Sequence, residues 1–522
     1  MRKFDTKVQH LKYKVLREVA REAWNGTLLE NVLDIPQKIV PGNTPTMRCC
    51  VYKERAILAD RVKIAMGGNK ENPNVITVIE TACDECPMGG YEVTNSCRGC
   101  LAHRCEDVCK RDAISFDHNH VAHIDKSKCV NCGACAKVCP FTAIINRKRP
   151  CQNACKVKAI SMNENKAAKI NNDKCISCGA CVQQCPFGAI VDKSFVMNVL
   201  NLLRDSWNNT SYHVYAVVAP AVASQYTGIK VGQVFAGIKE LGFYDVVEAA
   251  IAGDMVSVEE AKEFVETIEE KKWKTTSCCP AFVEYVRKNH PEYMDHVSTV
   301  VSPMIAMARA IRAKDRKARI VFIGPCTAKK VEIKQDDVKG AVDYVLTFEE
   351  LRAILDARGL ELAEMPEITA GEPSSYGRIF ARTGGVAESV RRVAKLEGIE
   401  TEINPIRCSG IEECIKTMKL ASFGRLEENL IEGMACKGGC TNGAASIFHD
   451  QRGIQRVNDF SRLALTDNPM EGIRGYDMAG VNMEREFPEL EKMKEVTAGE
   501  KKAKKQATAK AKKEAIAKGE VE

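Results

Sequence analysis

A cysteine pattern that occurs twice constrains this chain of 522 residues more than any other feature. Six cysteines recur with the same spacing 46 residues further along, and each copy ends in a run of the form C-x2-C-x2-C-x3-C-P. The first copy is Cys105, Cys109, Cys129, Cys132, Cys135 and Cys139, and the second is Cys151, Cys155, Cys175, Cys178, Cys181 and Cys185. Without a secretory signal, a reducing compartment is expected, where dense cysteine predicts metal or redox chemistry rather than disulfides.

The two runs, CVNCGACAKVCP and CISCGACVQQCP, resemble those of bacterial ferredoxins. Three thiolates of such a run hold three corners of a [4Fe–4S] cube, and the fourth serves the neighbouring cube. An Ala-Ile pair begins four positions after Cys109, Cys139, Cys155 and Cys185, as expected for a true repeat. Zinc is the alternative, but two complete runs with their prolines favour iron.

Counting the cysteines predicts four accessory cubes, two of them from the complete runs alone. Cys97 and Cys100 of the first module have no counterparts in the second, and Cys83 and Cys86 would supply the missing pair. The predicted sets are Cys129, Cys132, Cys135 with Cys109; Cys175, Cys178, Cys181 with Cys155; Cys97, Cys100, Cys105, Cys139; and Cys83, Cys86, Cys151, Cys185. Two alternatives stay open. Cys139 and Cys185 could exchange directly between the complete runs, or Cys83, Cys86, Cys97 and Cys100 could hold zinc.

The region after the cysteine-rich part predicts a different fold. From about residue 212 to 450, apolar strands such as HVYAVVAP and ARIVFIGP alternate with amphipathic helices. One helix is SVEEAKEFVETIEEK, with Ser257 as its expected N-cap. The predicted fold class is therefore an α/β domain with an N-terminal α+β ferredoxin-like iron–sulfur region.

The net charge of +7 comes from the end of the chain. Seven lysines and no acid lie between Lys501 and Lys513, so the remainder sums to about zero. Such a run is typical of a solvated tail, and we expect neither nucleic-acid nor membrane binding. No apolar run is long enough to span a membrane, and residues 1–30 lack a secretory core, which predicts a cytoplasmic protein.

Three further stretches carry five cysteines: TSCCPAF (276–282), GPCTAKKVE (324–332) and EGMACKGGCTNG (432–443). Cys436 and Cys440 are predicted on one face of a helical turn, because they are four residues apart. With Cys279 and Cys326 they supply enough thiolates for one more cube. Cys278 is adjacent to Cys279 and points elsewhere, so it is free for another role.

These stretches resemble, in the same order, the signatures of [FeFe]-hydrogenases: T-S-C-C-P, P-C-x-x-K-K-x-E and E-x-M-x-C-x-x-G-C-x-x-G. The resemblance covers about residues 45–450, and within this family the chain is similar to the ferredoxin-linked group B. It implies reversible formation of H2 from protons and electrons at an H-cluster in an anaerobic metabolism. That cofactor is a [4Fe–4S] cube and a two-iron subcluster with CO, cyanide and a dithiolate bridge. The implied ligands are Cys279, Cys326, Cys436 and Cys440, the last of which bridges the two parts.

The resemblance also implies roles for side chains that hold no iron. Cys278 would donate and accept the proton, for which a thiol is suited by its reference pKa near 8.5. Lys329 would donate to a cyanide ligand, and Met434 would pack against the two-iron unit. Glu260, Ser298 and Glu263 would carry the proton onward, in that order, to solvent.

The implied partners are ferredoxin or a similar electron carrier, H2 and protons, and the maturation proteins that insert the subcluster. The alternative is a non-catalytic hydrogenase-like iron–sulfur sensor or assembly protein. Assembly-type relatives tend to lack the proton-transfer thiol, so Cys278 favours the enzyme.

Cys49, Cys50, Cys408 and Cys414 are expected to be structural thiols.

The expected organisation of the chain has six parts. The parts are 1–82, a segment of unclear role; 83–192, the ferredoxin-type modules; 193–211, a linker helix; 212–450, the H-cluster domain; 451–490, a C-terminal extension; and 491–522, a Lys/Ala-rich tail.

Overall fold

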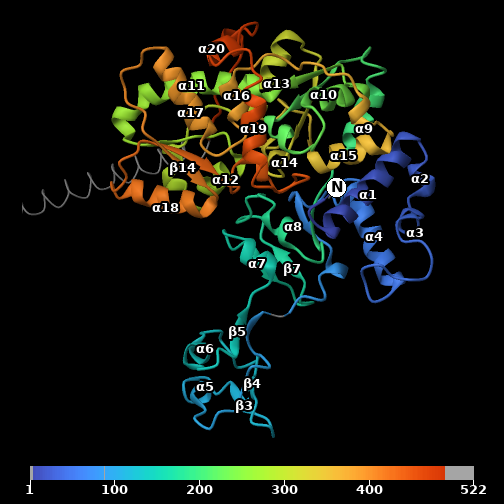
Figure 1. The fold of residues 1–522 in the computed structure, drawn as a ribbon, viewed down its shortest axis with the longest axis vertical. Helices are drawn as coiled ribbons and strands as arrows, with labels where there is room; N and C mark the ends of the chain where they lie inside the picture. The colour runs from blue at the N-terminus through green and yellow to red at the C-terminus, as the bar shows by residue number, and fades with distance from the viewer. Residues whose placement is uncertain (1–3, 88, 488–522) are drawn as a thin grey trace, which may run out of the picture. The chain divides into compact units, whose positions relative to one another are not determined.

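The computed structural model describes residues 4–87 and 89–487, so the tail predicted for 491–522 lies outside the described residues. The chain divides into two compact units (Figure 1). Of the described residues, the first unit contains 4–76, 176–179 and 192–487, and the second contains 77–87, 89–175 and 180–191. Within the described ranges, every helix is too short or too polar to cross a membrane.

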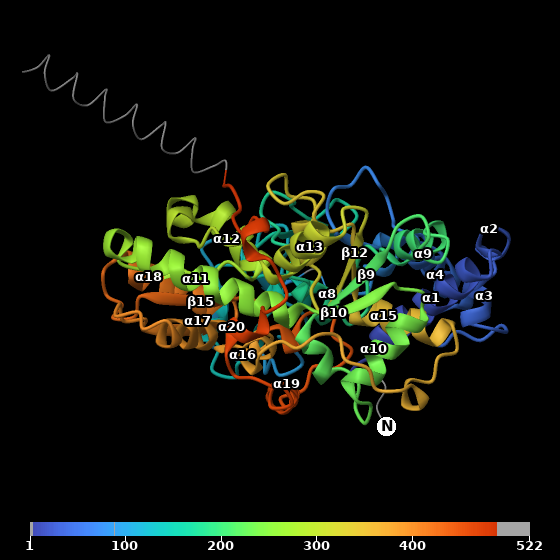
Figure 2. The same ribbon diagram turned by 90° about the horizontal axis from the view of Figure 1, so that it is seen from above.

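A four-stranded parallel sheet forms the centre of the first unit, in the order β10-β9-β12-β13. Its strands are β9 (Val214–Val218), β10 (Asp245–Glu248), β12 (Arg319–Gly324) and β13 (Tyr344–Thr347). Helix α13 (Pro303–Lys314) packs on β9, and α15 (Phe348–Ala357) packs on β12 and β13, as seen from above in Figure 2. The two central strands, β9 and β12, are almost wholly apolar and buried, because helices cover a parallel sheet of this kind. The two strands predicted from HVYAVVAP and ARIVFIGP are thus confirmed, and the structure pairs them as neighbours in this sheet.

A second parallel sheet has the order β11-β15-β14 and brings two of the three predicted cysteine stretches together. Its strands are β11 (Lys274–Thr275), β14 (Pro405–Ser409) and β15 (Leu430–Met434). All residues of the central strand β15 are buried. The carboxyl ends of β11 and β15 lie at the same edge, so the residues that follow the two strands are neighbours.

Helix α11 (Ala249–Lys271) begins eight residues earlier than predicted, and the expected cap at Ser257 is wrong. All residues from Ala249 to Val258 are buried. This half of the helix therefore lacks the alternation of apolar and polar residues from which an amphipathic helix is predicted. The Ser257 hydroxyl instead donates to the Gly253 carbonyl inside the helix, at 2.9 Å. Helix α11 packs against α13, α16 (Ser375–Ile379) and α17 (Gly385–Leu396).

The N-terminal segment, for which the sequence suggested no clear structure, is helical. Its helices are α1 (Lys7–Trp24), α2 (Leu28–Asn31), α3 (Ile35–Ile39) and α4 (Val51–Ala65). Helix α1 packs on α15 and on α9 (Val196–Asp205), the helix expected as a linker. Four apolar side chains of α9 are buried, so this helix is part of the core of the first unit. The thiols of Cys49 and Cys50 are exposed.

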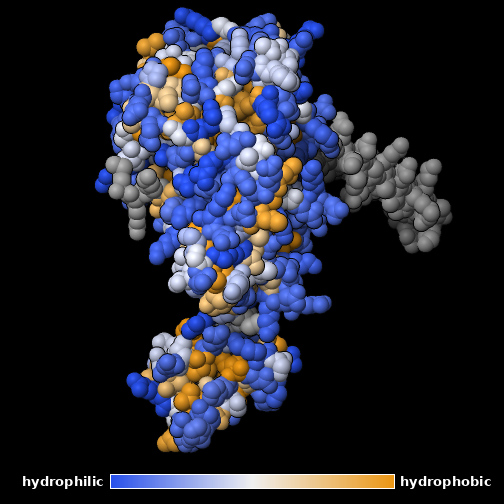
Figure 3. Space-filling model, turned by 90° about the vertical axis from the view of Figure 1, so that its right-hand side faces the viewer, coloured by the Kyte–Doolittle hydropathy of each residue, from blue (hydrophilic) through white to orange (hydrophobic). Residues whose placement is uncertain are grey.

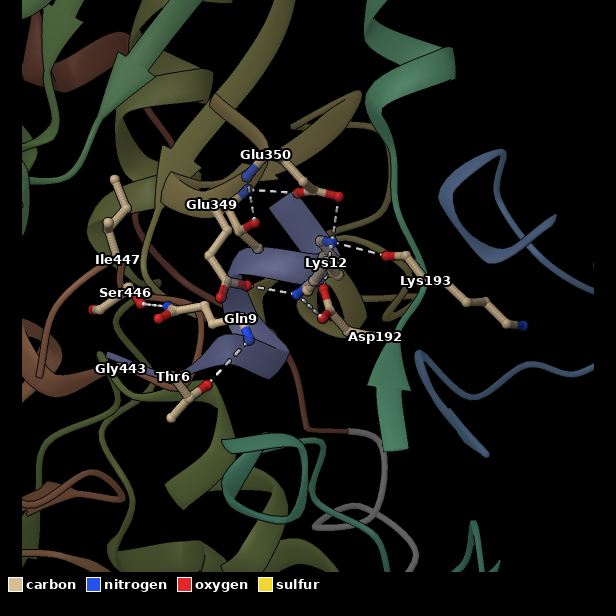
Figure 4. A network of polar contacts seen from close by, with 12 residues as sticks. Thr6, Gln9, Lys12, Asp192, Lys193, Glu349, Glu350, Gly443, Ser446 and Ile447 are labelled. Atoms are coloured by element: carbon tan, nitrogen blue, oxygen red, sulfur yellow. Dashed lines mark hydrogen bonds and ion pairs between the residues drawn. The ribbon is translucent and has the colours of Figure 1, made fainter. Parts of the chain in front are cut away.

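A buried network of charges joins α1 to the point where the chain returns to the first unit (Figure 4). The Lys12 ammonium pairs with Asp192 and with Glu349, the second residue of α15. The Lys330 ammonium pairs with Asp192 at 3.0 Å and Glu350 at 2.9 Å, and its side chain is fully buried. Burial alone would raise the pKa of Asp192, but the two lysines hold that pKa well below its usual range.

Removal of the Lys330 charge should strongly reduce the local stability of α1 and α15, which this charge network connects. In Lys330→Met, Glu350 loses its buried cation while Lys12 still reaches Asp192. A buried charge that loses its partner costs about 3–5 kcal/mol. We expect the free energy of local opening of α1 and α15 to fall by that amount in amide hydrogen exchange. The exposed Lys339→Met is the control and should shift it by less than about 0.5 kcal/mol. Parent-like exchange in Lys330→Met would show that the network adds no local stability.

The second unit contains the sequence repeat as a structural repeat. In each module a short helix, an antiparallel strand pair and a second helix follow one another, and each element recurs 46 residues later. The first module has α5 (Arg104–Asp107), β3 (Ile114–Phe116), β4 (Ala122–Ile124) and α6 (Ala134–Val138). The second has α7 (Pro150–Ala154), β6 (Ile160–Met162), β7 (Ala168–Ile170) and α8 (Ala180–Gln184). Strands β2 (Gly90–Val93) and β5 (Ile144–Arg147) form a further antiparallel pair.

The first module has a small apolar core, consisting of Ile114, Ala122, Cys135 and Ile144. Apolar side chains also reach the surface of this part of the chain, at the bottom of Figure 3, and they include Leu101, Val130 and Phe141. A core this small is typical of domains that bound metal stabilises.

Candidate active site

The adjacent cysteines Cys278 and Cys279 lie between β11 and helix α12 (Pro280–Asn289). Cys279 is the N-cap residue of α12, and Pro280 occupies its first turn. A Cβ atom on Gly433 of β15 would lie 2.5 Å from the ring of Phe282. Because Gly433 has no side chain, α12 can approach β15 closely, and this approach positions Cys279 at the start of α12.

The other three cysteines of this set also follow the carboxyl ends of parallel strands. Cys326 lies between β12 and the short helix α14 (Lys329–Glu332). Cys436 and Cys440 follow β15, but the helical turn predicted for them is wrong. Gly438 and Gly439 have φ values of +82° and +87°, which only glycine adopts readily, and they form a tight turn instead.

The four thiols of Cys279, Cys326, Cys436 and Cys440 converge on one cavity. Burial, followed by the neighbouring thiols, raises the pKa of Cys326 to about 11 and that of Cys440 to about 12. The same causes raise the pKa of Cys436 well above its usual range. Thiols in such a place become thiolates only when a cation replaces their protons, as a bound metal does.

Apart from Lys329 and two further cysteines, the rest of the cavity wall is apolar, which suits an iron–sulfur group that must be kept from water. Among the lining residues are Pro220, Phe322, Phe380 and Met434. Four convergent thiols with room beside them fit a [4Fe–4S] cube and an attached group, and they do not suit a hard cation such as Mg²⁺. Cys278 lines the same cavity without belonging to the convergent set.

Lys329 is the one cationic side chain among the residues that line this cavity. Its ammonium donates to the Ser302 hydroxyl at 2.8 Å and pairs with Glu332 at 2.7 Å. Glu332 is fully buried and is the glutamate of the second stretch. These two partners hold the ammonium at a fixed position beside Cys278, whose carbonyl oxygen is 3.5 Å from it.

Glu260 of α11 lies next to Cys278, the thiol of this cavity that is not one of the four convergent thiols. Its Oε1 atom is 4.0 Å from Cys278 Sγ and accepts from the Ser277 amide at 3.3 Å. Its Oε2 atom is buried without a hydrogen-bond partner among the described residues. Burial, followed by the charge of Glu263, raises the pKa of Glu260 to about 8, and burial raises the pKa of Cys278 well above its usual range. Both groups can therefore hold a proton at neutral pH.

Glu263 lies one helical turn further along α11 and stays charged. Its carboxylate accepts from the Ser298 hydroxyl at 2.6 Å and pairs with the buried Lys274 at 2.8 Å. Burial alone would raise the pKa of Glu263, but Lys274 and these hydrogen bonds lower it. Glu260, Ser298 and Glu263 thus lie on the same side of α11, with the two carboxyl groups in opposite protonation states.

One cysteine of the ferredoxin-type region also lines the cavity. Residues 176–179 belong to the first unit, and Cys178 is close enough to Cys436 to raise its pKa. The Thr327 hydroxyl donates to the Ser177 carbonyl at 2.7 Å. A Cβ atom on Gly179 would lie 2.5 Å from the methyl group of Ala444. The glycine of the run CISCGAC is therefore needed for this close contact.

The accessory cysteines of the second unit form separate groups. Burial, followed by Cys185 and Cys83, raises the pKa of Cys151 to about 11, and Cys86 lies with them. Cys105 lies with Cys100 and Cys139, and Cys97 packs in the same apolar cluster. Cys109, Cys129, Cys132 and Cys135 line one cavity of about 390 Å³.

These three groups match three of the four predicted sets, and they match neither alternative. The zinc alternative needs Cys83 and Cys86 beside Cys97 and Cys100, whereas the first pair lies with Cys151 and Cys185. A direct exchange between the complete runs needs Cys139 at the second run, whereas it lies with Cys105. The four repeated alanines have a common role, because each donates its amide to the thiol four residues before it, at 3.2–3.4 Å.

Several residues of the site could not be identified from the sequence. Lys274 pairs with Glu263 from a strand of only two residues, and Ser302 holds Lys329 from the N-cap of α13. Neither lies in a recognisable motif, although Glu332 could have been found as the last residue of P-C-x-x-K-K-x-E. Cys408 and Cys414 are both buried and lie against each other, outside the cavity.

Family models match three parts of the chain. The model described as "Iron only hydrogenase large subunit, C-terminal domain" matches residues 212–444. A 4Fe-4S dicluster domain matches residues 96–143, and a 4Fe-4S binding domain matches residues 168–191.

Curated relatives include both hydrogenases and an assembly protein. Iron hydrogenase 1 of Clostridium pasteurianum is 28% identical over 51% of this chain and 55% of its own length. The periplasmic [Fe] hydrogenase large subunit of Nitratidesulfovibrio vulgaris is 29% identical over 63% of this chain and 86% of its own length. Cytosolic iron-sulfur assembly component 3 of Mus musculus is 25% identical over 43% of this chain and 59% of its own length. The chain thus spans little more than half of the first and third relatives.

Proposed function

We propose, from the premise that this chain is an [FeFe]-hydrogenase-like protein with N-terminal ferredoxin-type iron–sulfur modules, that it catalyses reversible reduction of protons to H2. Cys279, Cys326, Cys436 and Cys440 would hold the H-cluster. When bound, that group supplies the redox iron at which electrons and protons combine. The remaining chemistry is done by the side chains of the chain.

One observation carries this proposal: a buried carboxyl group lies beside a thiol that no cube needs. Glu260 Oε1 is 4.0 Å from Cys278 Sγ; Glu260 is buried and Cys278 is half-buried. A protein that only bound or delivered a cube would need neither group at this place. General acid–base catalysis needs a donor within reach whose pKa is near the working pH, and burial gives Glu260 such a pKa.

The side chains have distinct roles in the proposed reaction. Cys278 Sγ delivers or accepts the proton at the cavity, and Glu260 Oε1 exchanges it with that sulfur. Ser298 Oγ and the Glu263 carboxylate continue the path towards solvent. Lys329 Nζ presents a fixed positive charge and hydrogen-bond donor to an anionic ligand such as cyanide, and Met434 and Phe322 help to exclude water.

Electrons would reach the cavity through the accessory clusters. A cube bound through Cys178 would have one corner beside Cys436, which supports transfer between the second module and the H-cluster. The other thiol groups would hold three more cubes. A ferredoxin or similar one-electron carrier is the proposed external partner, and maturation proteins would insert the two-iron subcluster.

Anaerobic expression of the full chain with these maturation proteins tests the proposal. We expect H2 evolution from reduced ferredoxin, and about 22 irons per chain from four accessory cubes and a six-iron active site. The chain prepared without maturation proteins is the control, and it should bind the cubes and evolve no H2. Full iron content without turnover in the matured chain would instead indicate an assembly or sensory protein.

A further inference from the structure

The fully buried side chain of greatest volume among the described residues is a cation, Arg149 of the second ferredoxin-type module. It is 1% exposed and is the N-cap residue of α7, two residues before Cys151. Its guanidinium donates to the carbonyl oxygens of Pro87, at 2.9 Å, and Cys86, at 3.3 Å. The third contact is to the sulfur of Cys83, at 3.8 Å.

No ion pair among the described residues includes Arg149. A guanidinium stays protonated in proteins, and a buried cation is costly unless an anion offsets its charge. The guanidinium contacts the sulfur of Cys83 and interacts with the Cys86 thiol, and these two thiols lie together with Cys151 and Cys185. Four thiolates that hold an iron–sulfur cube carry net negative charge, so this group would provide the missing counter-charge.

The internal repeat offers a natural comparison. The residue 46 positions earlier is His103, the N-cap residue of α5, two residues before Cys105. Its ring contacts Glu106 at 3.2 Å and stacks on Phe116 at a centroid distance of 3.7 Å. Neither of these contacts involves a sulfur atom, and the His103 side chain is partly exposed. The thiols of Cys83, Cys86, Cys151 and Cys185 therefore have a buried cation, Arg149, beside them. At the corresponding place in the first module, the described structure has the partly exposed His103 instead.

We propose that Arg149 is a built-in counter-ion that raises the reduction potential of the cluster held by Cys83, Cys86, Cys151 and Cys185. The inference rests on the proposed function, because it takes this thiol group to hold a [4Fe–4S] cube. Reduction takes one electron from the external carrier, [4Fe–4S]²⁺ + e⁻ → [4Fe–4S]⁺, and makes the cube and its thiolates one unit more negative. A fixed cation in a poorly hydrated place stabilises the more negative state, and the hydrogen bond to Cys83 acts in the same direction.

This difference would make the two corresponding clusters unequal as electron carriers. The cluster beside Arg149 would accept an electron more readily than the cluster held by Cys97, Cys100, Cys105 and Cys139. Electrons from the carrier would then collect at the second module.

A redox titration of the full chain, with its clusters reconstituted anaerobically and followed by electron paramagnetic resonance, tests the inference. In Arg149→Gln, we expect the reduction equilibrium of one accessory cluster to fall at least tenfold, which is about 59 mV for a one-electron couple. The other midpoints should stay where they are. In Arg149→Lys the charge remains, and the midpoint should stay within about threefold of the parent equilibrium. His103→Gln is the matched control and should move no midpoint. Unchanged midpoints in an Arg149→Gln chain with full iron content would overturn the inference.

If Arg149→Gln loses a cube, its midpoint cannot be compared with that of the parent, and Arg149→Lys then tests the role of the charge. Full iron with a parent-like midpoint supports a role for the charge, whereas loss of iron or a tenfold shift in Arg149→Lys overturns it. Metal analysis of the parent separates this test from the proposed function. Zinc in place of one cube would refute the cluster assignment itself, whereas absence of H2 turnover would leave the role of Arg149 intact.

Discussion

Cys278→Ala should lower H2 turnover by at least about 10³-fold while the chain keeps all its iron. The Cys278 thiol lines the cavity beside Glu260 but does not belong to the four convergent thiols. Its loss therefore removes the last proton donor on the path, whereas Cys279 continues to hold its corner of the cube. The measurements are anaerobic H2 evolution and iron content of the same preparation.

Cys408→Ala is the matched control for the loss of a buried thiol. Cys408 lies on β14, its thiol is 1% exposed, and it does not line the cavity. This variant should turn over H2 at the parent rate. If Cys278→Ala also retained the parent rate, protons would reach the cavity without this thiol and the proposed path would be wrong.

Glu260→Gln should slow turnover by about 10²–10⁴-fold, the usual contribution of a positioned acid or base. The amide keeps the shape of the protonated carboxyl group but cannot pass its proton on. Because burial and the charge of Glu263 raise the pKa of Glu260 to about 8, proton delivery in the parent should decline as the pH rises through about 8. The residual turnover of Glu260→Gln should lack this decline. A pH profile of H2 evolution measures both effects.

Glu259→Gln provides the control for Glu260→Gln on the same helix. Glu259 pairs with Lys262 at 2.9 Å on the outer side of α11, and its loss should leave turnover unchanged. Glu263→Gln is a poorer test of the path, because it would leave Lys274 buried without its partner and so reduce stability. Parent-like rates in both Glu260→Gln and Glu263→Gln would show that protons enter by another route.

The local spacing of cysteines was enough to predict the 4Fe-4S domains, which family models also match. The 46-residue repeat predicted two matching modules, and the structure contains them element by element. The strand predicted from ARIVFIGP is β12, which ends two residues before Cys326. These predictions succeeded because short motifs on a regular α/β scaffold depend little on distant contacts.

What the sequence could not predict depends on burial and long-range contacts. The first half of α11 is buried all round, so it shows no helical period, and Ser257 was taken for a cap. The charge network of Lys12 and Lys330 joins residues more than 300 positions apart, and α1 alone gives no sign of it. Cys178 looked like an ordinary ligand of its own run, and only the tertiary structure brings it beside Cys436.

The infrared spectrum of the full chain, matured anaerobically with its assembly proteins, tests the central claim most directly. Iron-bound CO and cyanide absorb where protein groups do not, so their bands report a two-iron subcluster at the four convergent thiols. We predict these bands in the parent and in Cys278→Ala, because the thiols that hold the cofactor remain in both. A matured chain that contains its accessory iron but shows no CO or cyanide bands would contradict the account, and the protein would then be an iron–sulfur protein without an H-cluster.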